Sequence, residues 1–206
     1  MTLNEIKKNA LALMFANYED DLSETNVDEV SNDEYKRYLV NMNAVINRAL
    51  SRIQSAGVLA DKSYEVASTD GDDGLVRLDL ATLISDFWRV SRVIYQSKSA
   101  YIPYLSFSME GNTIVLPKLK GDDKYIVMYK PKIDRIALTA ASNTEINIPN
   151  EVADLIPYFI KSELYEEDEP KLAVQARNIF EAMLEDLKRD EYASQEAVIN
   201  VFAGVC

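Results

Sequence analysis

The chain has 206 residues, 48% of them hydrophobic, so it is long enough to bury a core of its own. Its 34 acidic and 22 basic side chains give a net charge of −12, which argues against sequence-specific DNA binding because that activity needs a cationic surface. The chain has no histidine and one cysteine, Cys206, which excludes histidine-based triads, histidine metal ligands and an intrachain disulfide.

Helices are predicted at the start of the chain. Thr2-Leu3-Asn4-Glu5 is a capping box, and the apolar spacing after it predicts a helix that ends near Tyr18. Residues 19–29 are acidic and unpatterned, so we expect a loop. A second capping box, Ser31-Asn32-Asp33-Glu34, opens the strongest helical pattern in the sequence, which predicts a helix over Ser31–Ala56 with Gly57 as its C-cap.

The middle of the chain changes to the alternating pattern of strands. The expected strands are Lys62–Ala67, Leu75–Leu80, Phe87–Tyr95, Tyr101–Ser108, Thr113–Leu116 and Tyr125–Tyr129, followed by a half-buried strand at Ile146–Ile148. Asp70-Gly71-Asp72-Asp73-Gly74 is predicted to close a hairpin between the first two. Because no helical pattern separates these strands, we expect an antiparallel sheet or a pair of hairpins.

A helical pattern returns at Pro149. Its predicted apolar face consists of Val152, Leu155, Ile156, Phe159, Ile160 and Leu164. Pro157 should kink this helix, because its ring removes the hydrogen bond to the Ala153 carbonyl. A charged break at residues 166–170 precedes a second helix, capped by Asp168 or Glu169 and ending near Asp190. The stripe expected to face the first helix is Leu172, Ala176, Ile179, Phe180, Met183 and Leu187.

Two further segments have two interpretations each. Residues 193–206 contain one charge, Glu196, and five large apolar side chains, Val198, Ile199, Val201, Phe202 and Val205. They form either a short helix folded back on the core or an apolar tail that docks into a partner. The second segment is a set of basic residues interspersed with Tyr125 and Tyr129: Lys118, Lys120, Lys124, Lys130, Lys132 and Arg135. This pattern is typical of a solvated sheet face with half-buried tyrosines, and less often of a nucleic-acid surface with stacking aromatics.

The elements together predict an α+β fold. Helices from both chain ends, residues 2–57 and 149–190, form a bundle, and residues 60–148 form a central antiparallel β insertion. We expect residues 1–192 to make one domain and residues 193–206 to be a separate C-terminal tail. The acidic excess is concentrated late in the chain, since residues 146–206 carry 13 acidic and 5 basic side chains.

This order of parts resembles phage head–tail connector proteins of the adaptor type, which include the tail-tube adaptors of short-tailed phages. The resemblance covers roughly residues 20–190. Four sequence pieces carry the resemblance, in this order after an acidic loop. A capped helix start, Ser31 to Asn41, is followed by an aspartate–aromatic strand, Asp86-Phe87-Trp88-Arg89-Val90, and a Tyr-x-Pro strand, Tyr129-Lys130-Pro131. The last piece is an apolar strand with a proline and an acidic helix start, Ile146-Asn147-Ile148-Pro149-Asn150-Glu151, which leads to a helix hairpin. The sheet region is long for the smallest adaptors of this type.

The resemblance implies a structural virion protein without enzymatic activity, cofactor or metal. Such proteins form rings, often dodecamers, under the portal, extend the DNA channel and present a surface to tail or nozzle proteins. DNA passes through without specific binding, no membrane is involved, and the apolar tail would grip the portal. The expected location is the head–tail junction of the virion, after assembly in the host cytoplasm. Alternatives are another neck component (a stopper or tail-completion protein) or a small acidic hydrolase with a carboxylate pair.

Overall fold

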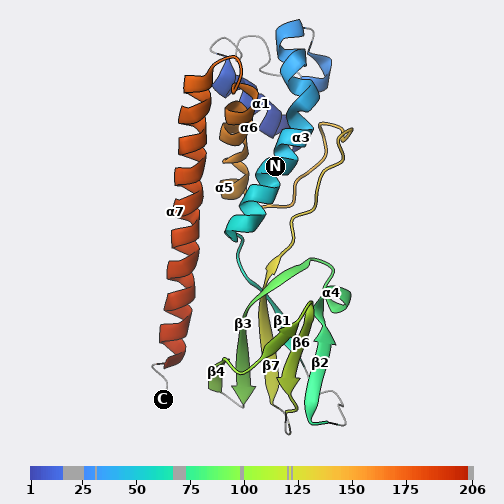
Figure 1. Cartoon of the computed structure of the whole chain (residues 1–206), viewed down its shortest axis with the longest axis vertical. Helices are drawn as coiled ribbons and strands as arrows, with labels where there is room; N and C mark the ends of the chain where they lie inside the picture. The colour runs from blue at the N-terminus through green and yellow to red at the C-terminus, as the bar shows by residue number, and fades with distance from the viewer. Residues whose placement is uncertain are drawn as a thin grey trace. The chain divides into compact units, whose positions relative to one another are not determined.

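The computed structural model describes residues 1–15, 26–30, 32–66, 73–97, 100–119, 121 and 123–203, with side chains described as far as Glu191. The chain divides into two compact units. The helical unit contains Met1–Val58 and Ile133–Asp190, and the β unit contains Leu59–Lys132 and the chain from Glu191 onward. Helices from both chain ends and antiparallel strands from the middle confirm the predicted α+β class (Figure 1).

Helix α1 (Leu3–Met14) begins at the predicted capping box. The Glu5 N–H donates to Thr2 Oγ1 at 3.2 Å, and the Thr2 N–H donates to Glu5 Oε2 at 2.7 Å. The helix ends at Met14, earlier than predicted, because Phe15 is extended and its ring packs 4.8 Å from that of Tyr35. Residues 19–25 of the predicted loop lie outside the described residues, and its end contains the short 3-10 helix η1 (Val27–Glu29).

Helix α3 (Asp33–Ala56) confirms the long helical pattern, with Gly57 as C-cap at φ 70°. Glycine reaches this left-handed conformation without the steric cost that a Cβ brings. The N-cap is Asn32, whose Oδ1 accepts the Glu34 N–H at 2.9 Å, so the predicted cap at Ser31 is wrong. Asparagine caps a helix as well as serine does, and the helix begins later than predicted. Ser31 itself lies outside the described residues.

The helix predicted after Pro149 is broken in two. Helix α5 (Asn150–Ala153) is followed by α6 (Ile156–Leu164), and Pro157 lies in the first turn of α6. A proline is tolerated there because the first N–H groups of a helix have no partner inside the helix. The predicted disruption at Ala153 is therefore present, but it separates two helices and does not kink one.

Helix α7 (Pro170–Ala203) starts with the predicted proline and runs beyond Asp190. Its buried side chains in the helical unit are Ala173, Ala176, Phe180 and Leu184, whereas Leu172 is 38% exposed and Ile179 44% exposed. The predicted stripe shares only Ala176 and Phe180 with this buried set. The buried side of α7 is therefore rotated about the helix axis relative to the predicted stripe, and contact with α6 explains this. The Phe180 ring packs edge-on against that of Phe159 at 5.0 Å, and small alanines on the same side of α7 allow close approach.

The predicted strand at Ile146–Ile148 is wrong. The only strand-like pairing that the structure describes here is one isolated bridge between Glu145 and Thr2, and the backbone then turns, since the Ile148 N–H donates to the Ile146 carbonyl at 3.0 Å. The Ile146 N–H donates to the Met1 carbonyl at 3.0 Å. Both isoleucines are buried, as the apolar pattern indicated. A strand cannot continue here because the backbone it meets turns into α1 at Leu3.

The β unit contains two antiparallel sheets. The first has the order β1-β7-β3-β4, with β1 (Lys62–Val66), β7 (Lys124–Pro131), β3 (Phe87–Ser97) and β4 (Ala100–Tyr104). The second has the order β2-β6-β5, with β2 (Leu75–Asp79), β6 (Thr113–Pro117) and β5 (Ser108–Glu110). Residues 67–72 lie outside the described residues, but β1 pairs with β7 and β2 with β6, so the predicted hairpin between β1 and β2 is wrong.

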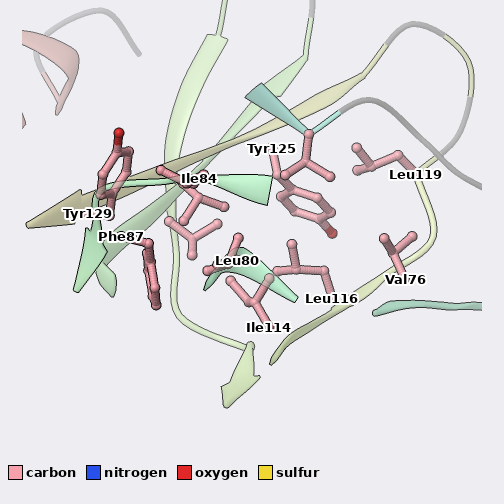
Figure 2. Packing of buried hydrophobic residues seen from close by; sticks show 12 residues of the cluster. Val76, Leu80, Ile84, Phe87, Ile114, Leu116, Leu119, Tyr125 and Tyr129 are labelled. Atoms are coloured by element: carbon pink, nitrogen blue, oxygen red, sulfur yellow. The ribbon is translucent and has the colours of Figure 1, made fainter. Parts of the chain in front are cut away.

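Both sheets contribute to one apolar core in the β unit. Figure 2 shows Val76, Ile114 and Leu116 from the smaller sheet gathered with Phe87, Tyr125 and Tyr129 from the larger one. The predicted strand Tyr101–Ser108 is split because β4 and β5 belong to different sheets. Leu80 also leaves the predicted strand and begins a short helix, α4 (Leu80–Leu83), whose cap Asp79 accepts the Ala81 N–H at 3.1 Å.

Candidate functional site

A surface groove of about 570 Å³ lies in the helical unit between α3 and the turn that joins α6 to α7. Concave surfaces with a few convergent polar groups are the usual starting point in a search for a site. Helix α3 lines the groove with Arg37, Tyr38, Asn41, Ala44, Val45 and Arg48, and α6 and the turn contribute Glu163, Leu164, Glu166, Glu167 and Asp168. Two arginines therefore face four carboxylates.

Asp168 is bound at one end of the groove by two neighbouring residues of α3. Tyr38 Oη donates to Asp168 Oδ2 at 2.7 Å, and Arg37 Nη2 donates to the same oxygen. The hydrogen bond from Tyr38, followed by that from Arg37, lowers the pKa of Asp168 below its ordinary value. Burial, followed by the same hydrogen bond, raises the pKa of Tyr38. Asp168 is thus held ionised and Tyr38 protonated.

Glu163 occupies the other end, between two arginines. Arg48 Nε donates to Glu163 Oε2 at 3.0 Å, and Arg177 Nη2 donates to Glu163 Oε1. The Arg177 guanidinium also lies 4.3 Å from the centre of the Phe159 ring, where the ring quadrupole attracts a cation. Glu163 consequently joins α3, α6 and α7 through its two carboxylate oxygens.

The ion pairs of the groove connect α3 to α6 and to the α6–α7 turn. Arg37 binds Asp168 of the α6–α7 turn and Arg48 binds Glu163 of α6, so the two ion pairs hold the turn and α6 against α3. A general acid needs a raised pKa, whereas the pKa of Asp168 is lowered, so Asp168 is not suited to that one role. Within the residues that the structure describes, no group of three or more histidine, cysteine, aspartate or glutamate side chains is placed to hold a metal ion.

The other side of α3 carries three amides that bind backbone. Asn47 Nδ2 donates to the Ile136 carbonyl at 2.8 Å, and Asn47 Oδ1 accepts the Ile136 N–H at 2.9 Å. Asn43 Nδ2 lies 2.9 Å from the Leu138 carbonyl and 3.3 Å from that of Ala140, and Gln54 accepts the Ile133 N–H at 2.5 Å. The segment that returns from the β unit is therefore fixed along α3 by side chains in place of strand partners.

Sequence reasoning did not identify these amides as anchors. Asn43, Asn47 and Gln54 are separated by four and seven residues, so they lie on one side of the helix. The row of amides beside the apolar stripe of this helix was the only sequence feature that indicated them. Polar side chains on a helix usually face solvent, and the backbone groups that these amides bind are about 90 residues away in sequence. The anchors hold the backbone of Leu138, whose side chain is 68% exposed.

The two tyrosines among the basic residues between 118 and 135 are not available for stacking on nucleic-acid bases. Tyr125 is 3% exposed and Tyr129 6% exposed, so neither ring can stack on a base. Burial raises the pKa of Tyr129 to about 12, with a further contribution from its hydrogen bond to Asp86. Lys130 is buried as well: its Nζ donates to the Leu59 carbonyl at 2.6 Å and lies 3.0 Å from Asp61 Oδ1. Lys120 lies outside the described residues.

The predicted partner-binding residues lie where side chains are not described. Val198, Ile199, Val201 and Phe202 fall on the described backbone of α7, which is helical to Ala203, and Val205 lies outside the described residues. Their role in docking stays a prediction. Among the residues that the structure does describe, no helix is both long enough and apolar enough to cross a membrane.

No family model matches the chain, and no curated protein matches it.

Proposed function

We propose that this chain is a structural virion protein, a head-to-tail connector adaptor. In this proposal it binds the portal as a ring, extends the DNA channel and provides the surface to which the tail attaches. Its role is mechanical and non-enzymatic, its partners are the portal, tail or nozzle proteins and further copies of itself, and its location is the head–tail junction.

The observation that carries the proposal is the way the helical unit is assembled. Residues 1–58 and residues 133–190 come from the two chain ends and fold into one compact unit. This is the order of parts on which the resemblance to adaptor proteins rests. The segment Ile146–Ile148 is not a strand, but both isoleucines are buried and α5 starts at Asn150, so the apolar segment, proline and helix start of the resemblance follow in the expected order.

The groove supports a mechanical role for the helical unit. Glu163 binds arginines from α3 and α7, and Arg52 Nη2 adds a second α3–α7 contact at 2.6 Å from Glu181 Oε2. An acidic surface also suits a channel for DNA, because like charges prevent the phosphates from binding. Asp168 and Glu163, two of the four carboxylates that line the groove, are already bound to arginine.

Gradient co-sedimentation with the portal ring of the same virus tests this proposal. Portal rings are far larger than a 23.3 kDa chain, so a bound chain moves to the portal fractions. We expect the full chain to co-sediment and the variant lacking residues 194–206 to remain at the top. A full chain that stays separate from the portal would argue for a stopper or tail-completion role. A truncated chain that still binds would place the portal contact elsewhere.

A further inference from the structure

The larger sheet of the β unit has one side that points away from the core between the two sheets. Along β7, Tyr125, Val127 and Tyr129 belong to that core. Side chains alternate along a strand, so Ile126 and Met128 point to the opposite side, and both are partly exposed. An antiparallel sheet commonly presents polar residues on its second side, so apolar residues there indicate that another element covers them.

The neighbouring strand continues this apolar surface. On β3, Ile94 is paired with Ile126, and Arg92 is paired with Met128. Residues directly opposite each other in an antiparallel pair share one side of the sheet. Ile94 is partly exposed, like its partner. We call Ile94, Ile126 and Met128 the outer face of the larger sheet.

Helix α7 already contacts this side of the sheet at Glu191, which belongs to the β unit. Lys130 follows Met128 by two residues on β7 and therefore lies on the same side. Its Nζ donates to Glu191 Oε1 at 2.8 Å and lies 3.0 Å from Asp61 Oδ1. The side chains of Lys130, Asp61 and Glu191 are only 7%, 5% and 18% exposed. Buried charges are costly without a partner, so this ion pair fixes α7 beside the outer face.

The rest of α7 is long enough to cross the outer face. The helix continues from Glu191 to Ala203, and at about 1.5 Å per residue this stretch is about 18 Å long. The strand from Lys130 back to Ile126 covers about 13 Å, at about 3.3 Å per residue. The chain from Glu191 onward also belongs to the same compact unit as the sheet.

The helical period selects the residues of this stretch that share the inward side of α7. Phe180 and Leu184 are buried, and Glu191 follows them by eleven and seven residues, close to whole numbers of turns. Val198 and Phe202 follow Glu191 by the same seven and eleven residues. The buried stripe of α7 thus continues through the ion pair at Glu191 to two large apolar residues.

We propose that residues 192–203 of α7 pack on the outer face through Val198 and Phe202, and that this contact restrains portal binding. The second part rests on the proposed function, in which the tail grips the portal. A tail that covers its own sheet must leave the sheet before it binds elsewhere, so its apparent affinity for the portal falls with the fraction of free tails. The contact is therefore autoinhibitory.

Thiol accessibility tests the contact in the chain alone. In a Cys206→Ser background, which removes the single native cysteine, Ile126→Cys and Met128→Cys each place one thiol on the outer face. The rate of reaction with a water-soluble thiol reagent is measured in the full chain and in the variant lacking residues 194–206. We expect both thiols to react at least about tenfold faster in the truncated chain, because in the full chain they react only when the segment opens. Equal rates in the two chains would overturn the proposal.

Val127→Cys is the matched control. Val127 lies on the same strand between the two test positions, but it is 0% exposed in the core between the sheets. Its thiol should react slowly in both chains. Faster reaction of the truncated chain at position 127 as well as at 126 and 128 would mean that the truncation opens the sheet, and would overturn the assignment of a cover on the outer face.

Glu191→Gln tests the restraint on portal binding. The substitution weakens the link to Lys130, which keeps Asp61 and the Leu59 carbonyl as partners, and it leaves residues 194–206 unchanged. We expect half-maximal co-sedimentation at a portal concentration at least about threefold lower, because a larger fraction of tails is free. Asp190→Asn, at the neighbouring exposed carboxylate, is the matched control and should bind like the unmodified chain. A Glu191→Gln variant that binds no more tightly than the unmodified chain would overturn the autoinhibitory role.

The thiol and portal experiments separate this inference from the proposed function. If the outer-face thiols react equally in both chains while the full chain binds the portal, the contact with the sheet is wrong and the adaptor role stands. If the segment protects the thiols but the full chain does not bind the portal, the adaptor role fails and the contact within the chain stands.

Discussion

The two sides of helix α3 hold their neighbours by different chemistry. On the side that faces α6, the α6–α7 turn and α7, three arginines bind carboxylates. These are Arg37, Arg48 and Arg52, and their side chains are 59%, 56% and 43% exposed. Toward the return segment, Asn43 and Asn47 bind backbone groups in part-buried positions. Exposed ion pairs contribute little to stability, whereas buried backbone groups without a partner cost free energy, so the amide side should matter more.

The largest effect is expected from Asn43→Asp. The substitution replaces the amide that donates to the Leu138 and Ala140 carbonyls with a carboxylate that can only repel them. We expect a loss of about 3 kcal/mol in the free energy of unfolding at pH 7. The folded state raises the pKa of this carboxyl above its unfolded value of about 3.9, so the loss should be small below that pH and grow as pH rises through the folded pKa.

Denaturant titrations of Asn43→Asp and the unmodified chain from pH 3 to pH 8 measure this effect. A constant difference across that range would mean that the aspartate is solvated and that the return segment is not held at this position.

Asn47→Ala should have the next largest effect. It leaves both the N–H and the carbonyl of Ile136 without their partner on α3, at a cost of about 1–2 kcal/mol. Asn41→Ala is the matched control: the same substitution on the same helix, at an exposed position in the groove. Its unfolding free energy should change by less than about 0.5 kcal/mol. Equal effects of the two substitutions in thermal or urea unfolding would remove the distinction between the two sides.

Arg52→Met should have a smaller effect that depends on salt. Arg52 binds Glu181 through two nitrogens, at 3.2 Å and 2.6 Å, but both side chains are partly exposed. Methionine keeps most of the apolar stem, so the expected loss is under about 1 kcal/mol at low salt. Because ions screen this pair, the difference should shrink as NaCl rises to about 1 M. A loss that is independent of salt would assign the effect to packing of the arginine stem.

The smallest effect concerns the pKa of Asp168. Tyr38→Phe removes the hydrogen bond that contributes most to lowering this pKa, so the carboxyl should titrate closer to its ordinary value. Because the pKa of the Asp168 carboxyl is lower in the folded protein than in the unfolded chain, this group stabilises the fold at pH values above its unfolded pKa. The stabilisation is lost as pH falls through its folded pKa. Tyr38→Phe should therefore reduce the acid-range dependence of stability. Carbon-13 NMR titration of the Asp168 carboxyl measures the shift, and an unchanged pKa would show that Arg37 alone sets it.

Local patterns predicted most helices because their causes are local. The capping box at Thr2 and the C-cap at Gly57 depend on residues within a few positions of each other, and the structure has both. Strand partners were not predictable in this way. The glycine and aspartate residues at 70–74 indicate a turn, but they do not determine which strand pairs with β1, and its partner β7 begins about 60 residues further along the chain.

The site was less accessible from sequence than the fold. On α7, stripes centred on Leu172 and Ile179 or on Ala173 and Leu184 both fit a helical period, and only contact with α6 decides between them. The anchors Asn43 and Asn47 were missed because their partners are uncharged backbone with no sequence pattern of its own. The buried side of α7 and the role of the two asparagines both depend on contacts between residues far apart in the sequence. The spacing of apolar residues along the chain contains no information about such contacts.

Electron microscopy of the chain mixed with the portal ring of the same virus is the decisive experiment on the adaptor role. If the chain is an adaptor, the images should contain a second ring, coaxial with the portal. A bare portal, with the chain remaining separate from it, would contradict the adaptor role.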